Sequence, residues 1–164
     1  MGKFRIKTID TAHLRIKYFF GYGYSYGEGR GREKFYSQRD ISPIPDWIKT
    51  DIIKRMEDVH LVPPGWINSV VINDYESGGF IVSHQDPFHL FKRPIFILTL
   101  LSGSALSFDS TFNFDRSGKN IEISCSDPSL RLPMYRGILT SFEGYNMDNV
   151  SSNLFQFQKS RIAF

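Results

Sequence analysis

Two polar pairs, each with one residue between its members, lie in the segment INDYESGGFIVSHQDPFHLF, residues 72–91. His84 and Asp86 are side chains that bind divalent metal ions, and Asn73 and Tyr75 carry hydrogen-bonding groups. Alternate residues of a β-strand lie on one face, so a strand would present each pair together. Two histidines and one carboxylate on one face form the usual site of non-haem Fe(II) oxygenases. The segment therefore predicts two of three ligands, although His-x-Asp by itself is more often structural or solvated.

The elements that must position these pairs are predicted to be mostly strands. Six β-rich runs follow Trp66: INSVVINDY (67–75), FIVSHQD (80–86), RPIFILTLLSG (93–103), ALSFDSTFNF (105–114), NIEISCS (120–126) and RGILTSFEG (136–144). Residues 14–27, LRIKYFFGYGYSYG, predict a strand that runs into a flexible loop. This order indicates a mainly β, α+β fold with a flanking helix, either a sandwich or a jelly-roll barrel.

The flanking helix is expected within SPIPDWIKTDIIKRMEDVHLVPPGW, residues 42–66. Its apolar residues recur at three- and four-residue spacing, which is helical periodicity: Ile48, Ile52, Met56 and Val59. Pro45 and Asp46 suit the first turn, and the pair Pro63-Pro64 is expected to stop the helix.

The bulk composition bounds the kind of protein. A chain of 164 residues predicts a single domain over residues 1–164, and a net charge of +3 weakly favours an anionic partner. The single cysteine, Cys125, excludes an internal disulfide and a zinc cluster of thiolates. No stretch has the length of a transmembrane helix, and the start MGKFRIKTID lacks the apolar core of a signal peptide. We expect an intracellular protein that does not associate with membranes.

The run NDYESGGFIVSHQDPFHLFKRPIFILTLLSGSALSF, residues 73–108, resembles the AlkB family of 2-oxoglutarate- and Fe(II)-dependent dioxygenases. Within that family it is most similar to members that demethylate N6-methyladenosine in RNA. The segments LRIKYFFGYGYSYG, IPDWI, PPGWINSVVINDY and LPMYRGILTSFEGY match in the same order, so the resemblance covers roughly residues 8–150. It implies a double-stranded β-helix (jelly-roll) domain, Fe(II) as cofactor and 2-oxoglutarate as co-substrate. It also implies methylated single-stranded RNA as partner and a nuclear location. We further expect a monomer.

The resemblance also implies a role for individual residues. His84 and Asp86 would bind iron. Asn73 and Tyr75 would hydrogen-bond the carboxylates of 2-oxoglutarate, and Arg161 matches the first of two late arginines, one of which pairs with this co-substrate. The remaining residues would line a nucleotide-recognition lid, where rings stack a flipped base and cations hold phosphates: Arg15, Lys17 and Tyr24.

The third iron ligand is missing from the expected place. The histidines are His13, His60, His84 and His89, and none follows residue 89. Alignment of Tyr145 and Asp148 with the family pattern puts Ser152 where the family has a histidine, and a neutral hydroxyl is a poor ligand for Fe(II). His89 is expected in a loop beyond Pro87. It remains an alternative ligand, as do the carboxylates of Asp148 and Glu143.

Other departures from the family also concentrate late in the chain. The second late arginine would fall beyond Phe164, and Ser110 and Asn153 occupy the places of a cysteine pair. Splicing, a gene-model error or a degenerate paralogue would each give this pattern.

Three hypotheses follow from these observations. The first is an oxidative RNA demethylase. The second is an RNA-binding pseudoenzyme whose iron centre is impaired. The third is a cupin-type binding protein, which the absence of a His-x-His pair disfavours. Conversion of 2-oxoglutarate to succinate separates the first from the second.

Overall fold

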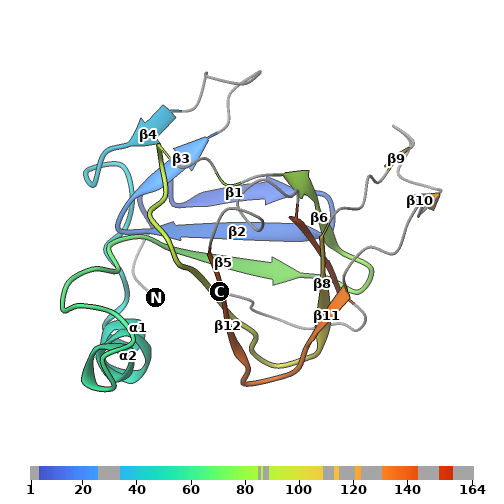
Figure 1. The fold of residues 1–164 in the computed structure, drawn as a ribbon. Coiled ribbons are helices and arrows are strands. Elements are labelled where there is room, and N and C mark those ends of the chain that lie inside the picture. Colours follow the sequence, from blue (N-terminus) through green and yellow to red (C-terminus); the bar gives the residue numbers. More distant parts are fainter. Residues whose placement is uncertain are drawn as a thin grey trace. The chain divides into compact units, whose positions relative to one another are not determined.

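A computed structural model describes residues 4–25, 34–84, 86, 89–108, 113–114, 121–122, 131–143 and 152–156. These residues are mainly in β-strands, with one helical segment (Figure 1). The chain falls into two compact units, each of them discontinuous in sequence. The first contains residues 1–12 and 16–73, and the second contains residues 13–15 and 74–164. The prediction of a single domain stays a prediction.

A three-stranded sheet has the order β1 (Ile9–Ala12), β2 (Arg15–Phe20), β5 (Val70–Tyr75). Most residues of these three strands belong to the first unit. The side of β2 that carries Tyr18 and Phe20 packs against Phe4, with ring centroids 5.9 and 6.1 Å apart. Thr8 is buried and donates its hydroxyl hydrogen to Ser42 Oγ over 2.9 Å, which ties the start of the chain to the segment before the helix. The core of this unit comprises Phe19, Phe20, Ile41, Ile44, Ile48, Ile53, Met56, Val62 and Ile72.

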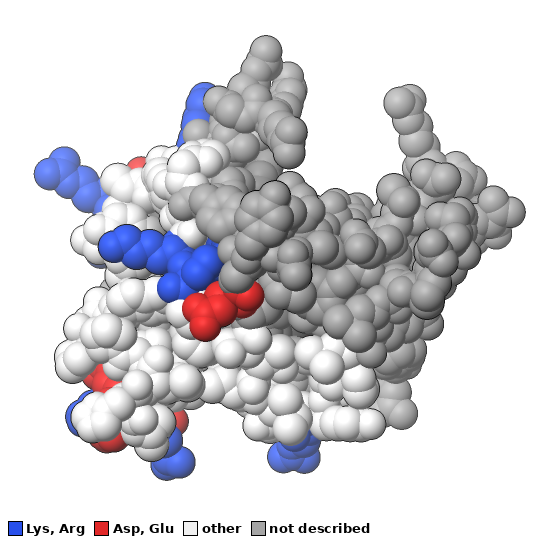
Figure 2. All heavy atoms as spheres, in the orientation of Figure 1, with Lys and Arg blue, Asp and Glu red and all other residues white. Residues whose placement is uncertain are grey.

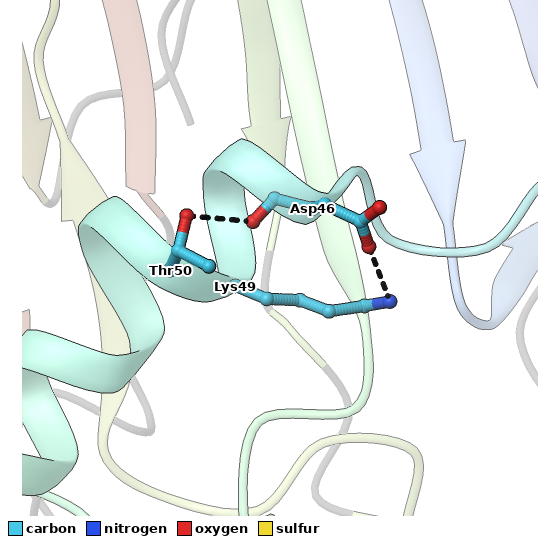
Figure 3. Close-up of polar contacts among 3 residues, drawn as sticks. All are labelled: Asp46, Lys49 and Thr50. Atoms are coloured by element: carbon cyan, nitrogen blue, oxygen red, sulfur yellow. Dashed lines mark hydrogen bonds and ion pairs between the residues drawn. The ribbon is translucent and has the colours of Figure 1, made fainter.

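The helix lies where the periodicity predicted it, as α1 (Asp46–Ile48), the π-helical turn η1 (Lys49–Ile53) and α2 (Lys54–Asp58). Pro45 precedes the first turn. In that turn Asp46 accepts two bonds, one from the Thr50 hydroxyl to its backbone carbonyl at 3.0 Å and one from Lys49 Nζ to its carboxylate at 3.1 Å (Figure 3). The sequence thus predicted where this helix begins.

The buried stripe of the helix differs from the predicted one at two positions. Ile53 is buried in place of Ile52, and Val59 is 72% exposed. A π-helical turn has five-residue rather than four-residue hydrogen bonding, so it advances the inward-facing position by one residue. The helix also ends at Asp58, before the proline pair, and His60 then takes a left-handed conformation with φ 57°. Val59 therefore lies outside the helical stripe.

The segment after β2 is not a loop throughout, which corrects the prediction. β3 (Gly23–Ser25) pairs antiparallel with β4 (Lys34–Tyr36), and Tyr24 lies opposite Phe35. The glycines there serve close packing, because a Cβ on Gly23 would lie 2.7 Å from Ile41 Cδ1. Gly21 has a φ of 78°, and a Cβ there would meet the backbone carbonyl of Asn68. Glycine at such positions resembles a loop signal in the sequence.

The second unit contains a four-stranded sheet with the order β11 (Arg131–Met134), β8 (Ser104–Phe108), β13 (Ser152–Gln156), β6 (Phe80–His84). β12 (Leu139–Phe142) pairs with β7 (Ile95–Leu98), and β10 (Ile121–Glu122) pairs with β9 (Asn113–Phe114). Its core cluster contains Tyr75, Leu106 and Met134, with Ile81 and Ile97 packed against it.

β11 was not among the predicted strands, and it contains Pro133, which cannot donate a backbone hydrogen bond. It is tolerated there because β11 is an edge strand of this sheet. The described strands do not close into a barrel, so the mainly β class with a flanking helix is observed while the jelly roll stays a prediction. Among the described residues, no helix is long and apolar enough to cross a membrane.

Candidate functional site

The end of β5 places two of the predicted polar residues. Asn73 and Tyr75 both belong to this strand, so the predicted strand alternation holds for this pair. Tyr75 is 3% exposed and belongs to the core cluster of the second unit. Among the described residues, the side-chain oxygen Oδ1 of Asn73 is buried and has no hydrogen-bond partner. A buried amide group without a partner is costly unless a ligand supplies one.

Arg15, the first residue of β2, is hydrogen-bonded to Tyr75. The guanidinium donates and the phenol oxygen accepts. Burial raises the pKa of Tyr75 above its ordinary value, and the charge of Arg15 and this hydrogen bond act in the opposite direction. The phenol therefore stays neutral at physiological pH. Two guanidinium nitrogens of Arg15, Nε and Nη1, are buried and have no hydrogen-bond partner in the part of the chain that the structure describes.

His84 is the last residue of β6, and its strand partner is the residue predicted to replace the third ligand. In the antiparallel pairing of β13 with β6, Ser152 lies directly opposite His84. On its other side, Ser152 lies opposite Phe108 of β8. Directly opposed positions of an antiparallel pair belong to the same face of a sheet and are neighbours on it. Position 152 is therefore adjacent to the proposed ligand His84.

Asp86 lies beyond the end of β6, so the strand alternation that was expected to place it with His84 does not extend to it. It is half-buried, and its backbone carbonyl accepts a hydrogen bond from Arg93 Nη2 over 2.8 Å. Within the described parts of the chain, no three His, Cys, Asp or Glu residues are grouped so that they could hold a metal ion.

The alternative ligands differ in what is known of their positions. His89 is an exposed turn residue, as its place after Pro87 predicted, and Glu143 is an exposed residue after β12. Asp148 lies outside the described residues. So does Arg161, the predicted partner of 2-oxoglutarate.

Lys17 and Tyr24, two of the predicted lid residues, share one neighbour in the first unit, the buried ring of Phe19. The Lys17 ammonium lies 5.2 Å from the centroid of this ring, and the Tyr24 ring meets it edge-on with centroids 5.4 Å apart. Lys17 Nζ also pairs with Asp10 Oδ2 at 2.9 Å. Sequence reasoning missed Phe19 and Asp10. Strand alternation could have identified Phe19, since it lies two residues after Lys17 on β2.

Positive and negative side chains lie close together on the described surface, as Lys17 and Asp10 do. Figure 2 shows the described Lys and Arg side chains of one face in separate groups, with acidic side chains beside some of them. Lys17 is an example of a paired cation, whose side chain is 16% exposed while that of Asp10 is 53% exposed. The described part of this face therefore carries mixed charge.

Comparison with known proteins gives a consistent result. No family model matches the chain. The chain is 43% identical over 155 residues to the RNA demethylase ALKBH5 of Mus musculus, an alignment that covers 92% of this chain and 38% of that protein. It is 42% identical over 155 residues to the RNA demethylases ALKBH5 of Xenopus tropicalis and Bos taurus, and covers 42% and 38% of them. The chain thus spans about two fifths of the length of these relatives. Over that span it is a homologue of the AlkB-family RNA demethylases, as its motifs indicated.

Proposed function

We propose that this chain acts as an Fe(II)- and 2-oxoglutarate-dependent demethylase of N6-methyladenosine in single-stranded RNA. The observation that carries the proposal is the 43% identity, over 92% of this chain, to a protein named an RNA demethylase. The family resemblance of the motifs supports a nuclear location, and we also propose a monomer.

The residues at the end of β5 fit 2-oxoglutarate. Within the described part of the chain, Oδ1 of Asn73 has no hydrogen-bond partner and the phenol of Tyr75 is buried. An amide nitrogen and a phenol hydroxyl are both able to donate to carboxylates. Rotation of the amide exchanges its oxygen and nitrogen, so its unpartnered atom can become a donor. In this role Asn73 and Tyr75 bind and orient the co-substrate.

The donor set fits Fe(II) only in part. His84 and Asp86 are suitable ligand types, whereas the residue opposite His84 is a serine. When bound, iron with 2-oxoglutarate would supply the oxidation of an N-methyl group by dioxygen, with release of formaldehyde. Lys17 and Tyr24 would hold the RNA, by charge and by stacking respectively.

The position of Ser152 favours a second candidate function, an RNA-binding protein with an impaired iron centre. Only two protein ligands would remain, so iron would bind weakly and turnover would be slow or absent.

Turnover of 2-oxoglutarate to succinate, with formaldehyde release from N6-methyladenosine RNA, decides between the two functions. The chain should be compared with Ser152→His and with the negative control His84→Ala. The demethylase assignment requires product formation that His84→Ala abolishes, and restoration by Ser152→His would show an impaired site of the same type. RNA binding with no product from the chain itself would establish the second function, whether or not Ser152→His restores turnover.

A further inference from the structure

The N-terminal segment of the first unit is bound along the turn at residues 38–40, which precedes the helix. The backbone amide of Lys7 donates to the carbonyl of Asp40 over 3.2 Å. The guanidinium of Arg5 donates to the carbonyl of Ile41 over 3.0 Å and also to the carbonyl of Gln38. These hydrogen bonds hold Arg5 and Lys7 against the turn.

Arg39 adds a third cation at the same place, because it occupies the middle of this turn. The preceding residue, Gln38, is one whose carbonyl accepts from Arg5. The following residue, Asp40, is the one whose carbonyl accepts from the Lys7 amide. All three basic residues are exposed. Arg5, Lys7 and Arg39, here called the turn cluster, therefore bring positive charge from two distant parts of the sequence to one surface.

The charge of the turn cluster lacks the compensation that other cations of this protein have. Three lysines elsewhere form ion pairs: Lys17 with Asp10, Lys49 with Asp46 and Lys54 with Asp58. Within the described ranges, no ion pair involves Arg5, Lys7 or Arg39. The turn contains one carboxylate, that of Asp40, which accepts a hydrogen bond from the Ser37 hydroxyl over 2.9 Å. Three cations around one carboxylate leave an excess of positive charge, which favours an anionic partner.

Aromatic rings lie beside these cations and indicate what kind of anion binds there. Lys7 Nζ lies 5.5 Å from the centroid of the Tyr36 ring. Phe4, which precedes Arg5, is 47% exposed, and its ring centroid lies 5.9 Å from that of Tyr18. An exposed ring next to fixed cations suits a polynucleotide strand, because bases stack on rings while cations bind the phosphates. An acidic peptide would pair with the cations alone, so the rings favour a nucleic acid.

We propose that the turn cluster, together with the Phe4 ring, is a second RNA-binding surface, which holds nucleotides that flank the methylated one. This inference rests on the proposed function for the identity of its ligand, single-stranded RNA. It goes beyond that function, because none of these residues belongs to the predicted lid, the iron site or the co-substrate site. The turn cluster adds affinity for long strands without contacting the reacting nucleotide.

The test compares methylated RNA strands that differ in length. Fluorescence anisotropy should be measured with single strands of about 4 and about 16 nucleotides, the range of site sizes of single-strand-binding folds, each with one central N6-methyladenosine. Lys7→Gln combined with Arg39→Gln removes two exposed cations and keeps Arg5, which binds backbone carbonyls. Lys49→Gln combined with Lys54→Gln is the matched control, because it lowers the net charge by the same amount on the exposed helix surface. Polyglutamate serves as an anion without bases.

We expect the Lys7→Gln/Arg39→Gln variant to bind the long RNA about tenfold more weakly than the chain at about 0.1 M salt. The slope of log affinity against log salt should become shallower by about 1.4, because each phosphate contact of a single strand contributes about 0.7. The short RNA should bind the chain and this variant alike, and the control should follow the chain with both RNAs. Charge reversal, Lys7→Glu with Arg39→Glu, should weaken the long RNA further. Thermal unfolding of every variant should match that of the chain, since the substituted side chains are exposed.

Three results would overturn the inference while leaving the proposed function intact. One is a loss no larger than that of the control, which would reflect net charge alone. Another is an equal loss for short and long RNA, which would place the turn cluster in the lid. The third is unchanged RNA affinity with loss of polyglutamate binding, which would assign the surface to an acidic protein. If the unmodified chain binds neither RNA, the RNA partner itself fails, and the proposed function fails with it.

Discussion

At the scale of single residues, the amide of Asn73 tests the co-substrate site most directly. Asn73→Ala should weaken 2-oxoglutarate binding by about 1–3 kcal/mol, since it removes a hydrogen bond to a charged group. Metal binding should change less, because the amide is not a proposed ligand. Titration calorimetry with 2-oxoglutarate and with Mn(II) measures both effects. Asn68→Ala, at an exposed asparagine earlier in the chain, is the control. Equal affinity in the two variants would remove Asn73 from the site.

The phenol of Tyr75 predicts an alkaline loss of stability. Its pKa is raised in the folded protein, above the ordinary 10.0, chiefly by burial. The unfolded chain therefore releases this proton at lower pH than the folded chain does. The stabilisation is complete below pH 10.0 and is lost as pH rises through the folded pKa. In urea titrations between pH 8 and 11, about one unit either side of an ordinary tyrosine pKa, the free energy of unfolding should fall less in Tyr75→Phe than in the chain. Parallel curves would contradict the assignment.

The chemistry of the candidate site could be predicted from residue types, but its contacts could not. The spacing of Asn73 and Tyr75 predicted one strand face correctly, because both residues lie inside β5. The same rule did not extend to Asp86, because β6 ends at His84. The bond between Arg15 and Tyr75 joins residues 60 positions apart in sequence, and a single sequence carries no signal for such a pairing. The roles of the site residues remain predictions.

At the scale of elements, the register of β13 against β6 gives a prediction for the metal site. Ser152→His should raise metal affinity by about tenfold or more, equivalent to about 1.4 kcal/mol, because an imidazole would be placed opposite His84. Asn153→His is the matched control, since the adjacent position of a strand belongs to the opposite face. Titration with Mn(II) or Co(II) measures the difference. An equal gain in both variants would show that the register does not determine the site.

The π-helical turn in the flanking helix predicts unequal effects at two neighbouring isoleucines. Ile53→Ala should destabilise the protein by about 2–4 kcal/mol, the cost of truncating a buried isoleucine. Ile52→Ala should cost clearly less, since Ile52 is only half-buried. Urea unfolding of the two variants measures this. A larger cost at Ile52 would indicate a regular α-helix through this segment.

The elements themselves were largely predictable, for reasons that also explain the misses. The helix start followed from Pro45 and Asp46, and the long β-rich runs became strands. The burial of Ile53 in place of Ile52 results from the π-helical turn. A regular helical periodicity of the sequence does not reveal such a turn. β11 contains Pro133, and β3 contains Gly23, so local propensity opposed both strands while pairing stabilised them.

At the scale of the whole molecule, modest net charge and mixed surface charge predict RNA binding that depends on stacking as well as on phosphate contacts. Single-stranded RNA should bind more tightly than duplex, and affinity should fall as salt increases. Lys17→Ala combined with Tyr24→Ala should weaken single-stranded binding, whereas Lys49→Ala with Trp47→Ala, an equivalent pair on the helix, should not. Fluorescence anisotropy at fixed salt measures both. Equal affinity for duplex and single strand would argue against the lid assignment.

The discontinuous make-up of the second unit limits how the chain can be divided. A fragment that begins at Asp74 would omit residues 13–15, which belong to that unit. The backbone amide of Glu76 would lose its acceptor, the carbonyl of Leu14 at 3.0 Å. Gly79 would lose its close contact with the same carbonyl oxygen, which leaves no room for a Cβ at position 79. The guanidinium of Arg15 would be lost with them. A proteolytic cut near residue 74 would therefore leave residues 13–15 of this unit on the other fragment, so residues 74–164 do not make up the whole unit.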